Sequence, residues 1–280
     1  MSMKNNLGEY LSYPKLLGKI LSANRGIKVN KLSYGNEKNQ YLLSFLPEKE
    51  DKETVIVYIH GGGWRHGSPK GFKYIGQEFA QLGYRTVLLG YRHAPKYKYP
   101  LIAEDIFLGL NKYIELQKTK GRSVENVVVV GSSAGAHLGA VLVYERNLQK
   151  KYNIKQEIFT GFIALGGPIV FDVCKNCTIT KLLKGLFPND YDRKKADPYY
   201  LLKGDEDIRV LCIHAKKDPI CEMENSVCFT NKIISGLAQC NIVEDKNMFH
   251  SNLVAGIFLY DLPITNLLYN WIEEVQNRKS

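Results

Sequence analysis

From Lys28 onward the chain alternates between strand-like and helix-like segments, and this order constrains the fold more than any other feature of the sequence. The strand-like segments are short and rich in β-branched residues, whereas the helix-like segments carry apolar residues at helical spacing. The expected strands are 40–46, 54–60, 85–89, 127–130, 158–165, 208–214 and 241–244. The expected helices are 71–82, 101–117, 134–148, 222–237 and 262–275. Such alternation predicts an α/β fold, with a mostly parallel central sheet covered by helices on both faces.

Length and composition favour one domain over residues 1–280. With 280 residues, 45% of them apolar, the chain can bury one large core, and no linker or repeat marks a boundary. Residues 166–207 interrupt the alternation and contain only a short helical pattern, near 180–186. Because long insertions in α/β enzymes often cover the site, we interpret 166–207 as a cap, with a plain surface excursion as the alternative.

The charge pattern does not indicate a nucleic-acid partner. The net charge is +10, but the 38 lysines and arginines are scattered, and the longest basic run is Arg193-Lys194-Lys195. A solvated surface explains this distribution. No apolar run reaches about 18 residues and no leader pattern opens the sequence, so we expect a cytoplasmic protein without a membrane partner.

The six cysteines do not require disulfides, because a chain of this length can build its own core. Cys174 and Cys177 form a single C-x-x-C pair without a second pair or a nearby histidine, too few ligands for zinc. We therefore expect reduced thiols, no metal and no cofactor.

A G-x-S-x-G pentapeptide, residues 131–135, lies between the expected strand 127–130 and the expected helix 134–148. This context makes Ser133 a candidate nucleophile, because a sharp strand-to-helix turn exposes the serine hydroxyl above a helix N-terminus. The pentapeptide alone is a weak signal, since short glycine and serine strings commonly mark loops.

A second glycine motif, His60-Gly61-Gly62-Gly63-Trp64, follows the expected strand 54–60. Ligands of open α/β sheets bind at the carboxyl ends of strands, and successive glycines allow backbone N–H groups to converge on an oxyanion. We predict that Gly62, Gly63 and Ala134 donate to it. A tight glycine-rich turn is the alternative. A phosphate-binding loop is disfavoured, because neither G-x-x-x-x-G-K-[ST] nor G-x-G-x-x-G follows this strand.

A serine nucleophile needs a base, and the sequence contains six histidines. We choose His250, because it lies in an expected loop between the last strand and the last helix, where its side chain can reach the sheet edge. The other five precede this region, in the glycine loop, in early loops, in the helix after Ser133 or at a strand end: His60, His66, His93, His137 and His214.

The orienting carboxylate should lie between the serine and the histidine in the chain order Ser, Asp or Glu, His. Asp218 meets this condition, since it follows the expected strand 208–214. Asp245 and Glu222 are the fallback candidates. Considered alone, Asp218 is typical of a turn residue before proline, and His250 of a surface loop residue. The order of Ser133, Asp218 and His250 along the chain, together with their loop positions, favours a triad.

From about Lys52 to the C-terminus, the chain resembles the α/β-hydrolase superfamily, and within it the esterases of the hormone-sensitive-lipase type. The resemblance rests on the two glycine motifs, on the segment 90–95 with Tyr99-Pro100 and Asp105, on Asp218-Pro219 and on His250. It implies that Ser133 is the nucleophile, His250 the general base and then acid, and Asp218 the orienting carboxylate. It also implies a structural ion pair between Arg92 and Asp105.

Three details bear on the substrate. Ser132 stands where many relatives carry an acidic residue, which leaves open any contact made by that acid. The run from Ser133 to Leu138 is also similar to kynurenine formamidases, although their glycine motif usually has tyrosine where Gly63 stands. Tyrosines of the insertion either line the pocket or pack in the core: Tyr191, Tyr199 and Tyr200.

These observations predict a serine hydrolase that cleaves short-chain or acetyl carboxylic esters through an acyl-enzyme on Ser133. Its expected partner is a small-molecule ester, and a homodimer is possible. Two alternatives stay open: an arylformamidase that uses the same residues on a formyl amide, and a catalytically silent hydrolase fold that serves as a binding module.

Overall fold

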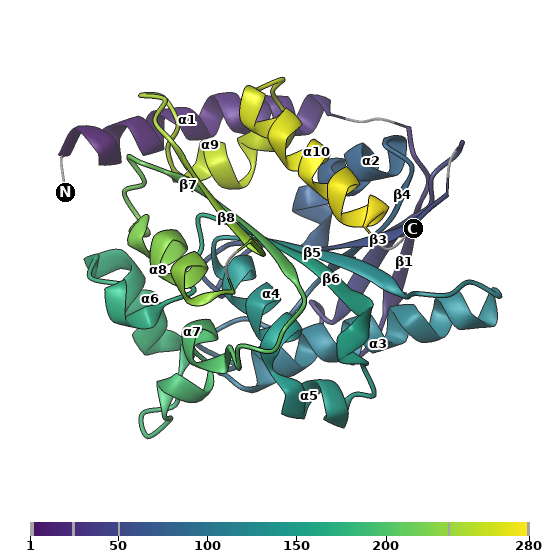
Figure 1. The fold of residues 1–280 in the computed structure, drawn as a ribbon. Coiled ribbons are helices and arrows are strands. Elements are labelled where there is room, and N and C mark those ends of the chain that lie inside the picture. The colour runs from purple at the N-terminus through teal and green to yellow at the C-terminus, as the bar shows by residue number, and fades with distance from the viewer. Residues whose placement is uncertain (1–2, 24–25, 50, 235, 279–280) are drawn as a thin grey trace.

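The computed structural model describes residues 3–23, 26–49, 51–234 and 236–278, and at its centre lies one eight-stranded sheet (Figure 1). The spatial order of the strands is β1-β2-β4-β3-β5-β6-β7-β8. Strands β3 to β8 run parallel, whereas β2 runs antiparallel to both of its neighbours. Their bounds are β1 Val29–Ser33, β2 Tyr41–Phe45, β3 Lys52–Ile59, β4 Tyr84–Leu89, β5 Asn126–Ser132, β6 Phe159–Leu165, β7 Arg209–Ala215 and β8 Ala238–Val243.

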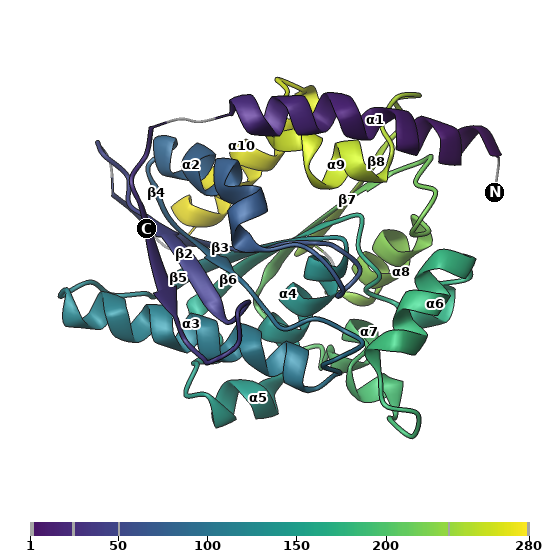
Figure 2. The ribbon, with the colours of Figure 1, turned by 180° about the vertical axis from the view of Figure 1, so that it is seen from behind.

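Helices cover both faces of the sheet (Figures 1 and 2). Helices α2 (Lys73–Gln81), α9 (His250–Val254) and α10 (Pro263–Asn277) pack on one face, and α1 (Met3–Ser22) packs against α9. Helices α3 (Leu101–Thr119), α4 (Ala134–Tyr144) and α8 (Glu224–Lys232) pack on the other. The shorter helices are α5 (Arg146–Lys151), α6 (Cys177–Leu186) and α7 (Pro198–Leu201), and the 3-10 turns are η1 (Pro69–Phe72), η2 (Gln156–Ile158), η3 (Phe171–Val173), η4 (Arg193–Lys195) and η5 (Gly256–Phe258).

The sheet separates two apolar cores, because successive side chains of a strand point to opposite faces. In β5, Val127 and Val129 belong to the core under α3 and α4, whereas Val128 and Val130 belong to the core under α2 and α10. All four valines are fully buried. Burial on both faces explains why this strand reads as an unbroken apolar run.

The register of the parallel strands brings four loops to one edge. Ile59 of β3 pairs with Gly131 of β5, Ser132 pairs with Leu165 of β6, and Leu165 pairs with Ile213 of β7. The segments that follow these strands therefore open at the same carboxyl edge. They include the glycine loop, Ser133 and Asp218.

The predicted α/β architecture is confirmed, with differences at the margins. Helix α1 and strand β1 were not predicted, because α1 contains Pro14 and divides its apolar residues between a buried and an exposed face, and β1 is a largely polar edge strand paired with β2. The helix expected over 134–148 is divided at Glu145, whose non-helical backbone (φ −85°, ψ 88°) ends α4 and whose carboxylate accepts a hydrogen bond from Leu148 N of α5. The helix expected to reach 237 ends at Lys232.

Candidate active site

Ser133 lies on a sharp turn between β5 and α4, as the pentapeptide predicts. Its backbone angles are φ 52° and ψ −122°, a sparsely populated region whose strain costs roughly 1–3 kcal/mol. The turn is held by the Ser133 N–H, which donates to Leu165 O at 2.8 Å. Glycine is required at 135, because a Cβ there would lie 2.1 Å from Ile59 O. The local sequence therefore presents the Ser133 hydroxyl at the edge of the sheet.

His250 accepts a hydrogen bond from Ser133. The distance from Ser133 Oγ to His250 Nε2 is 2.9 Å, and the His250 side chain is 7% exposed. His250 does not lie in a loop, as the sequence predicted, but is the first residue of α9, because residues 250–254 close one helical turn before η5. The helix start fixes the direction of the side chain more firmly than a loop would.

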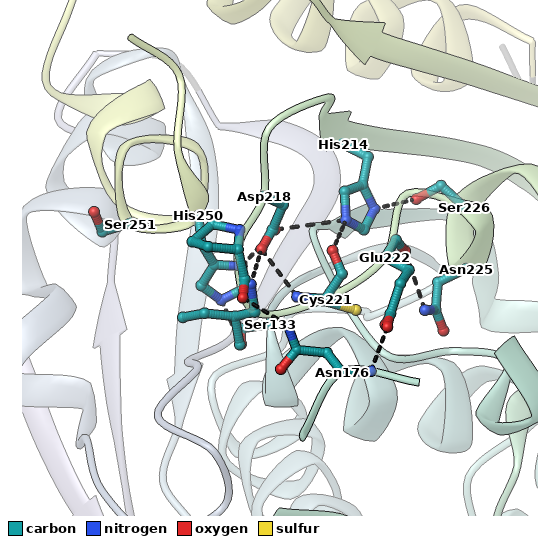
Figure 3. A network of polar contacts seen from close by, with 12 residues as sticks. Ser133, Asn176, His214, Asp218, Cys221, Glu222, Asn225, Ser226, His250 and Ser251 are labelled. Atoms are coloured by element: carbon teal, nitrogen blue, oxygen red, sulfur yellow. Dashed lines mark hydrogen bonds and ion pairs between the residues drawn. The ribbon is translucent and has the colours of Figure 1, made fainter. Parts of the chain in front are cut away.

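Asp218 completes the chain of hydrogen bonds (Figure 3). His250 Nδ1 donates to Asp218 Oδ2 at 2.6 Å, and Asp218 Oδ1 accepts from the backbone N–H groups of Ile220 at 2.8 Å and Cys221 at 2.9 Å. With Nδ1 protonated toward a carboxylate, the lone pair of Nε2 faces the Ser133 hydroxyl. The structure thus brings together the three side chains that the sequence proposes as a triad.

Electrostatic interactions keep Asp218 ionised and raise the pKa of His250. Burial alone would raise the pKa of the Asp218 carboxyl, but His250 and His214 lower that pKa well below its usual value. For His250, burial lowers the pKa, and the charge and hydrogen bond of Asp218 more than offset it, so the net pKa is raised. Asp218 is therefore an anion that favours the imidazolium of His250.

His214 is buried at the end of β7, as expected, but its contact with Asp218 was not predicted. Its Nε2 donates to Cys221 O at 3.1 Å and lies 3.5 Å from Asp218 Oδ2, while Nδ1 accepts from Ser226 Oγ at 2.9 Å (Figure 3). His214 therefore supports the Asp218 turn from behind.

Neither fallback carboxylate contacts the imidazole of His250. Glu222 accepts hydrogen bonds from the backbone N–H groups of Lys175 and Asn176, and Asp245 accepts from Asn247 N. The chain order allowed any of these three acids to orient His250. In the structure, Asp218 is the one that contacts its imidazole.

Gly62, Gly63 and Ala134 line the same pocket as Ser133. Gly62 and Gly63 have φ values of +120° and +59°, which turn the loop back over the strand end. Ala134 begins α4, so its N–H lies at the positive end of the helix. Among the residues that the structure describes, no acceptor takes a hydrogen bond from these three N–H groups. They are therefore available to an oxyanion.

Two buried histidines, His60 and His137, support the glycine loop through hydrogen bonds. His60 Nδ1 donates to Gly61 O at 2.8 Å, and the His60 ring stacks on Tyr91 at 4.4 Å between centroids. Trp64 Nε1 donates to His137 Nδ1 at 3.2 Å, and His137 Nε2 donates to Ala196 O. Burial lowers the pKa of His60 and of His137 to about 4, so both are neutral structural groups.

A cavity of about 450 Å³ opens in front of Ser133 and His250, and its lining is mostly apolar. Two helices form opposite walls. Leu16, Leu17 and Ile20 come from α1, and Thr178, Ile179 and Leu182 come from α6. The α6 wall belongs to the segment 166–207, while Tyr191, Tyr199 and Tyr200 of that segment do not line the cavity. Tyr191 instead packs against Tyr99 and Phe187.

Helix α1 also contributes a buried carboxylate that the sequence did not reveal. Glu9 Oε1 accepts from Ser251 N at 3.0 Å, next to His250, and Ser12 Oγ lies 2.6 Å from Ser251 Oγ. The charge of Glu9 is a further cause that raises the pKa of His250. A contact across 242 residues leaves no local sequence signal.

Three side chains singled out by the resemblance have structural contacts. Arg92 Nε lies 2.9 Å and its Nη2 2.8 Å from the carboxylate of Asp105, which is fully buried and also accepts from Gln40 Nε2. The predicted ion pair is confirmed. Ser132 is buried, with its Oγ 2.7 Å from Tyr58 Oη.

Within residues 3–23, 26–49, 51–234 and 236–278, no cluster of three or more His, Cys, Asp or Glu side chains suits a metal ion. All six cysteines are free thiols; Cys174 is buried and Cys177 is exposed. None of the described helices combines the length and the apolar character that crossing a bilayer requires.

The mostly parallel sheet, the strand-turn-helix at Ser133 and the order of the three polar side chains define the α/β-hydrolase class. Within this class, the family model described as BD-FAE matches residues 43–233, and the chain belongs to that family.

Two curated relatives are similar over a shorter part of the chain. Arylacetamide deacetylase of Bos taurus is 28% identical over 41% of this chain and 31% of its own length. Carboxylesterase NlhH of Mycobacterium tuberculosis is 31% identical over 34% of this chain and 30% of its own length. The matched part thus spans less than a third of either relative.

Solved structures match nearly the whole fold. Esterase B from Lactobacillus rhamnosis has a TM-score of 0.74 at 16% identity, covering 99% of this chain and 98% of that protein. The hyperthermophilic esterase from the archaeon Pyrobaculum calidifontis has a TM-score of 0.73 at 18% identity, covering 99% and 94%. At these identities the likeness concerns the fold.

Proposed function

We propose that the chain is a serine carboxylesterase that cleaves short-chain or acetyl esters of small molecules. The observation that carries the proposal is the continuous hydrogen-bonded path from Asp218 through His250 to Ser133, at 2.6 and 2.9 Å, beside an apolar cavity. The names of the relatives, which include a carboxylesterase and esterases, support an ester substrate.

In the proposed reaction, Ser133 Oγ attacks the ester carbonyl carbon while His250 Nε2 takes the hydroxyl proton. The N–H groups of Gly62, Gly63 and Ala134 stabilise the developing oxyanion, each by about 3 kcal/mol. His250 then gives the proton to the leaving alkoxide, and the acyl group stays on Ser133. A water molecule, deprotonated by His250, releases the acid and restores the serine. Asp218 holds the imidazole tautomer throughout, and no cofactor takes part.

We also propose that residues 1–280 act as one domain in which α6, within 166–207, is the cap. Leu182 of α6 approaches Gly63 closely, since a Cβ at 63 would lie 3.1 Å from its methyl groups. This contact supports the proposal that α6 covers the oxyanion hole. A bulkier side chain at 182 should therefore narrow the cavity beside Gly63.

The test compares the wild type with Ser133→Ala on a chromogenic acetate ester and with a fluorophosphonate probe. We expect the variant to lose activity by about 10³-fold or more and to lose probe labelling. Ser132→Ala is the matched control, because it removes a neighbouring hydroxyl that faces Tyr58. Full activity of folded Ser133→Ala would refute the proposal, and a wild type that neither turns over ester nor reacts with the probe would indicate a binding module.

A panel of acetyl to octanoyl esters together with N-formylkynurenine would define the substrate. The proposal predicts higher kcat/KM on short esters than on the formyl amide. The reverse order would identify an arylformamidase that uses the same residues.

A further inference from the structure

Helix α1 carries a row of exposed apolar side chains that no part of the described chain covers. Tyr10, Leu11, Leu17 and Leu21 are 72, 66, 57 and 77% exposed. They are four of the seven large apolar side chains exposed in the described residues, and the other three are scattered over the molecule. Tyr10, Leu17 and Leu21 are seven and four positions apart, so they share one helix face. We call these four residues the α1 apolar stripe.

The opposite face of α1 fixes the direction of this stripe. Leu16 is 4% exposed and contributes to the cavity wall, and the buried carboxylate of Glu9 accepts from Ser251 N of α9. The helix cannot turn the α1 apolar stripe inward without removing both groups from their contacts. The stripe therefore faces outward in the folded protein, along a helix of 20 residues and about 30 Å.

Positive charge lies beside the stripe. Lys15 and Lys19 are exposed and one helical turn apart, on the flank next to Leu11. The Lys19 ammonium lies 4.0 Å from the centre of the Tyr260 ring, which holds it on this side of the helix. An exposed apolar face with lysines at its border is the pattern of a helix that lies in the plane of a lipid surface.

We propose that the α1 apolar stripe docks on an anionic phospholipid surface, with α1 parallel to it. A second copy of the chain fits this face less well, because a two-fold contact would bring the lysines and the net charge of +10 of two chains together. Anionic lipid headgroups neutralise the same charges. The prediction of no membrane partner concerned spanning segments, which a helix on the surface does not need.

Leu17 connects the stripe to the cavity, because it is exposed on the outer side and also lines the cavity wall. An ester dissolved in the lipid surface would thus reach the cavity beside Leu17 without crossing bulk water. This step rests on the proposed ester hydrolysis, whereas the docking does not.

The experiment measures co-sedimentation of the full chain with vesicles of phosphatidylglycerol and phosphatidylcholine, and with vesicles of phosphatidylcholine alone. The test variant is Tyr10→Gln/Leu11→Gln/Leu21→Gln, which leaves the cavity-lining Leu17 in place. The control variant is Leu101→Gln/Val227→Gln/Ile234→Gln, which removes the same number of exposed apolar side chains elsewhere. Circular dichroism and activity on a soluble acetate ester show that each variant is folded.

We expect the wild type and the control variant to bind the anionic vesicles and the test variant to bind at least about tenfold more weakly. Lys15→Gln/Lys19→Gln should weaken binding to anionic vesicles, and salt should have the same effect. Absence of wild-type binding to the anionic vesicles would overturn the proposal. So would a dimer in sedimentation equilibrium that the test variant dissociates while vesicle binding is unchanged. A Ser133→Ala chain should bind vesicles normally, which separates this result from a failure of the proposed hydrolysis.

Discussion

Replacing Asp218 with asparagine tests the proposed mechanism most sharply, because the three groups that form hydrogen bonds with this carboxylate all donate to it. The N–H groups of Ile220 and Cys221 point at Oδ1, and His250 Nδ1 points at Oδ2. An asparagine has only one side-chain oxygen. If that oxygen keeps the two backbone donors, the amide NH2 faces His250 Nδ1 across 2.6 Å.

This donor-to-donor contact is relieved only if the imidazole moves its hydrogen from Nδ1 to Nε2. An Nε2–H group cannot accept the proton of Ser133, although the ring stays in place. In a serine protease, the equivalent change of tautomer lowers kcat by about 10⁴-fold, which corresponds to about 5 kcal/mol in the activation barrier. We expect a loss of this size here, with a loss in unfolding free energy below about 2 kcal/mol because the substitution is isosteric.

The assay compares kcat on a chromogenic acetate ester with the free energy of unfolding in urea. Asp245→Asn is the matched control, since Asp245 lies near His250 in the chain but its carboxylate accepts a hydrogen bond from Asn247 N. It should leave kcat within about twofold. A folded Asp218→Asn protein that retained a tenth of wild-type kcat would refute the tautomer argument, as would an equal loss in the control.

The remaining predictions concern pH and two ion pairs. Because the pKa of His250 is raised above 6.5 and the base must be neutral, kcat/KM should increase as pH rises through that pKa, and an acidic midpoint below 6.5 would contradict this. The protonated His250 stabilises the fold fully below pH 6.5 and loses this contribution as pH rises through the raised pKa, which urea unfolding at several pH values would measure. Asp105→Asn should destabilise the protein by about 2–4 kcal/mol, because it leaves the mostly buried Arg92 without its anion. Asp205→Asn, in the exposed pair with Arg146, should cost under about 1 kcal/mol, and equal effects would disprove the role of burial.

Much of the fold could be predicted because its signals are local. The valine run of β5 is buried on both faces, and the close approach of β3 requires a glycine at 135. Elements without a local apolar pattern escaped prediction. Strand β1 forms through backbone pairing with β2, and Glu145 ends a helix whose composition would continue it.

The candidate site was predictable as a set of residue types but not as a geometry. The order of Ser133, Asp218 and His250 along the chain names the participants, and the parallel register explains why their loops meet at one edge. That His250 begins a helix, and that His214 supports Asp218, follows from packing that the order does not contain.

The sequence by itself determined the layered α/β architecture and the turn at Ser133, because strand burial, helical periodicity and glycine requirements act between residues close in the chain. The tertiary structure alone decided which carboxylate reaches His250, which helices wall the cavity and where the apolar face of α1 points. These outcomes depend on contacts between distant segments, such as Glu9 with Ser251. Such contacts form only when the whole sheet and its covering helices are in place, so no local pattern encodes them.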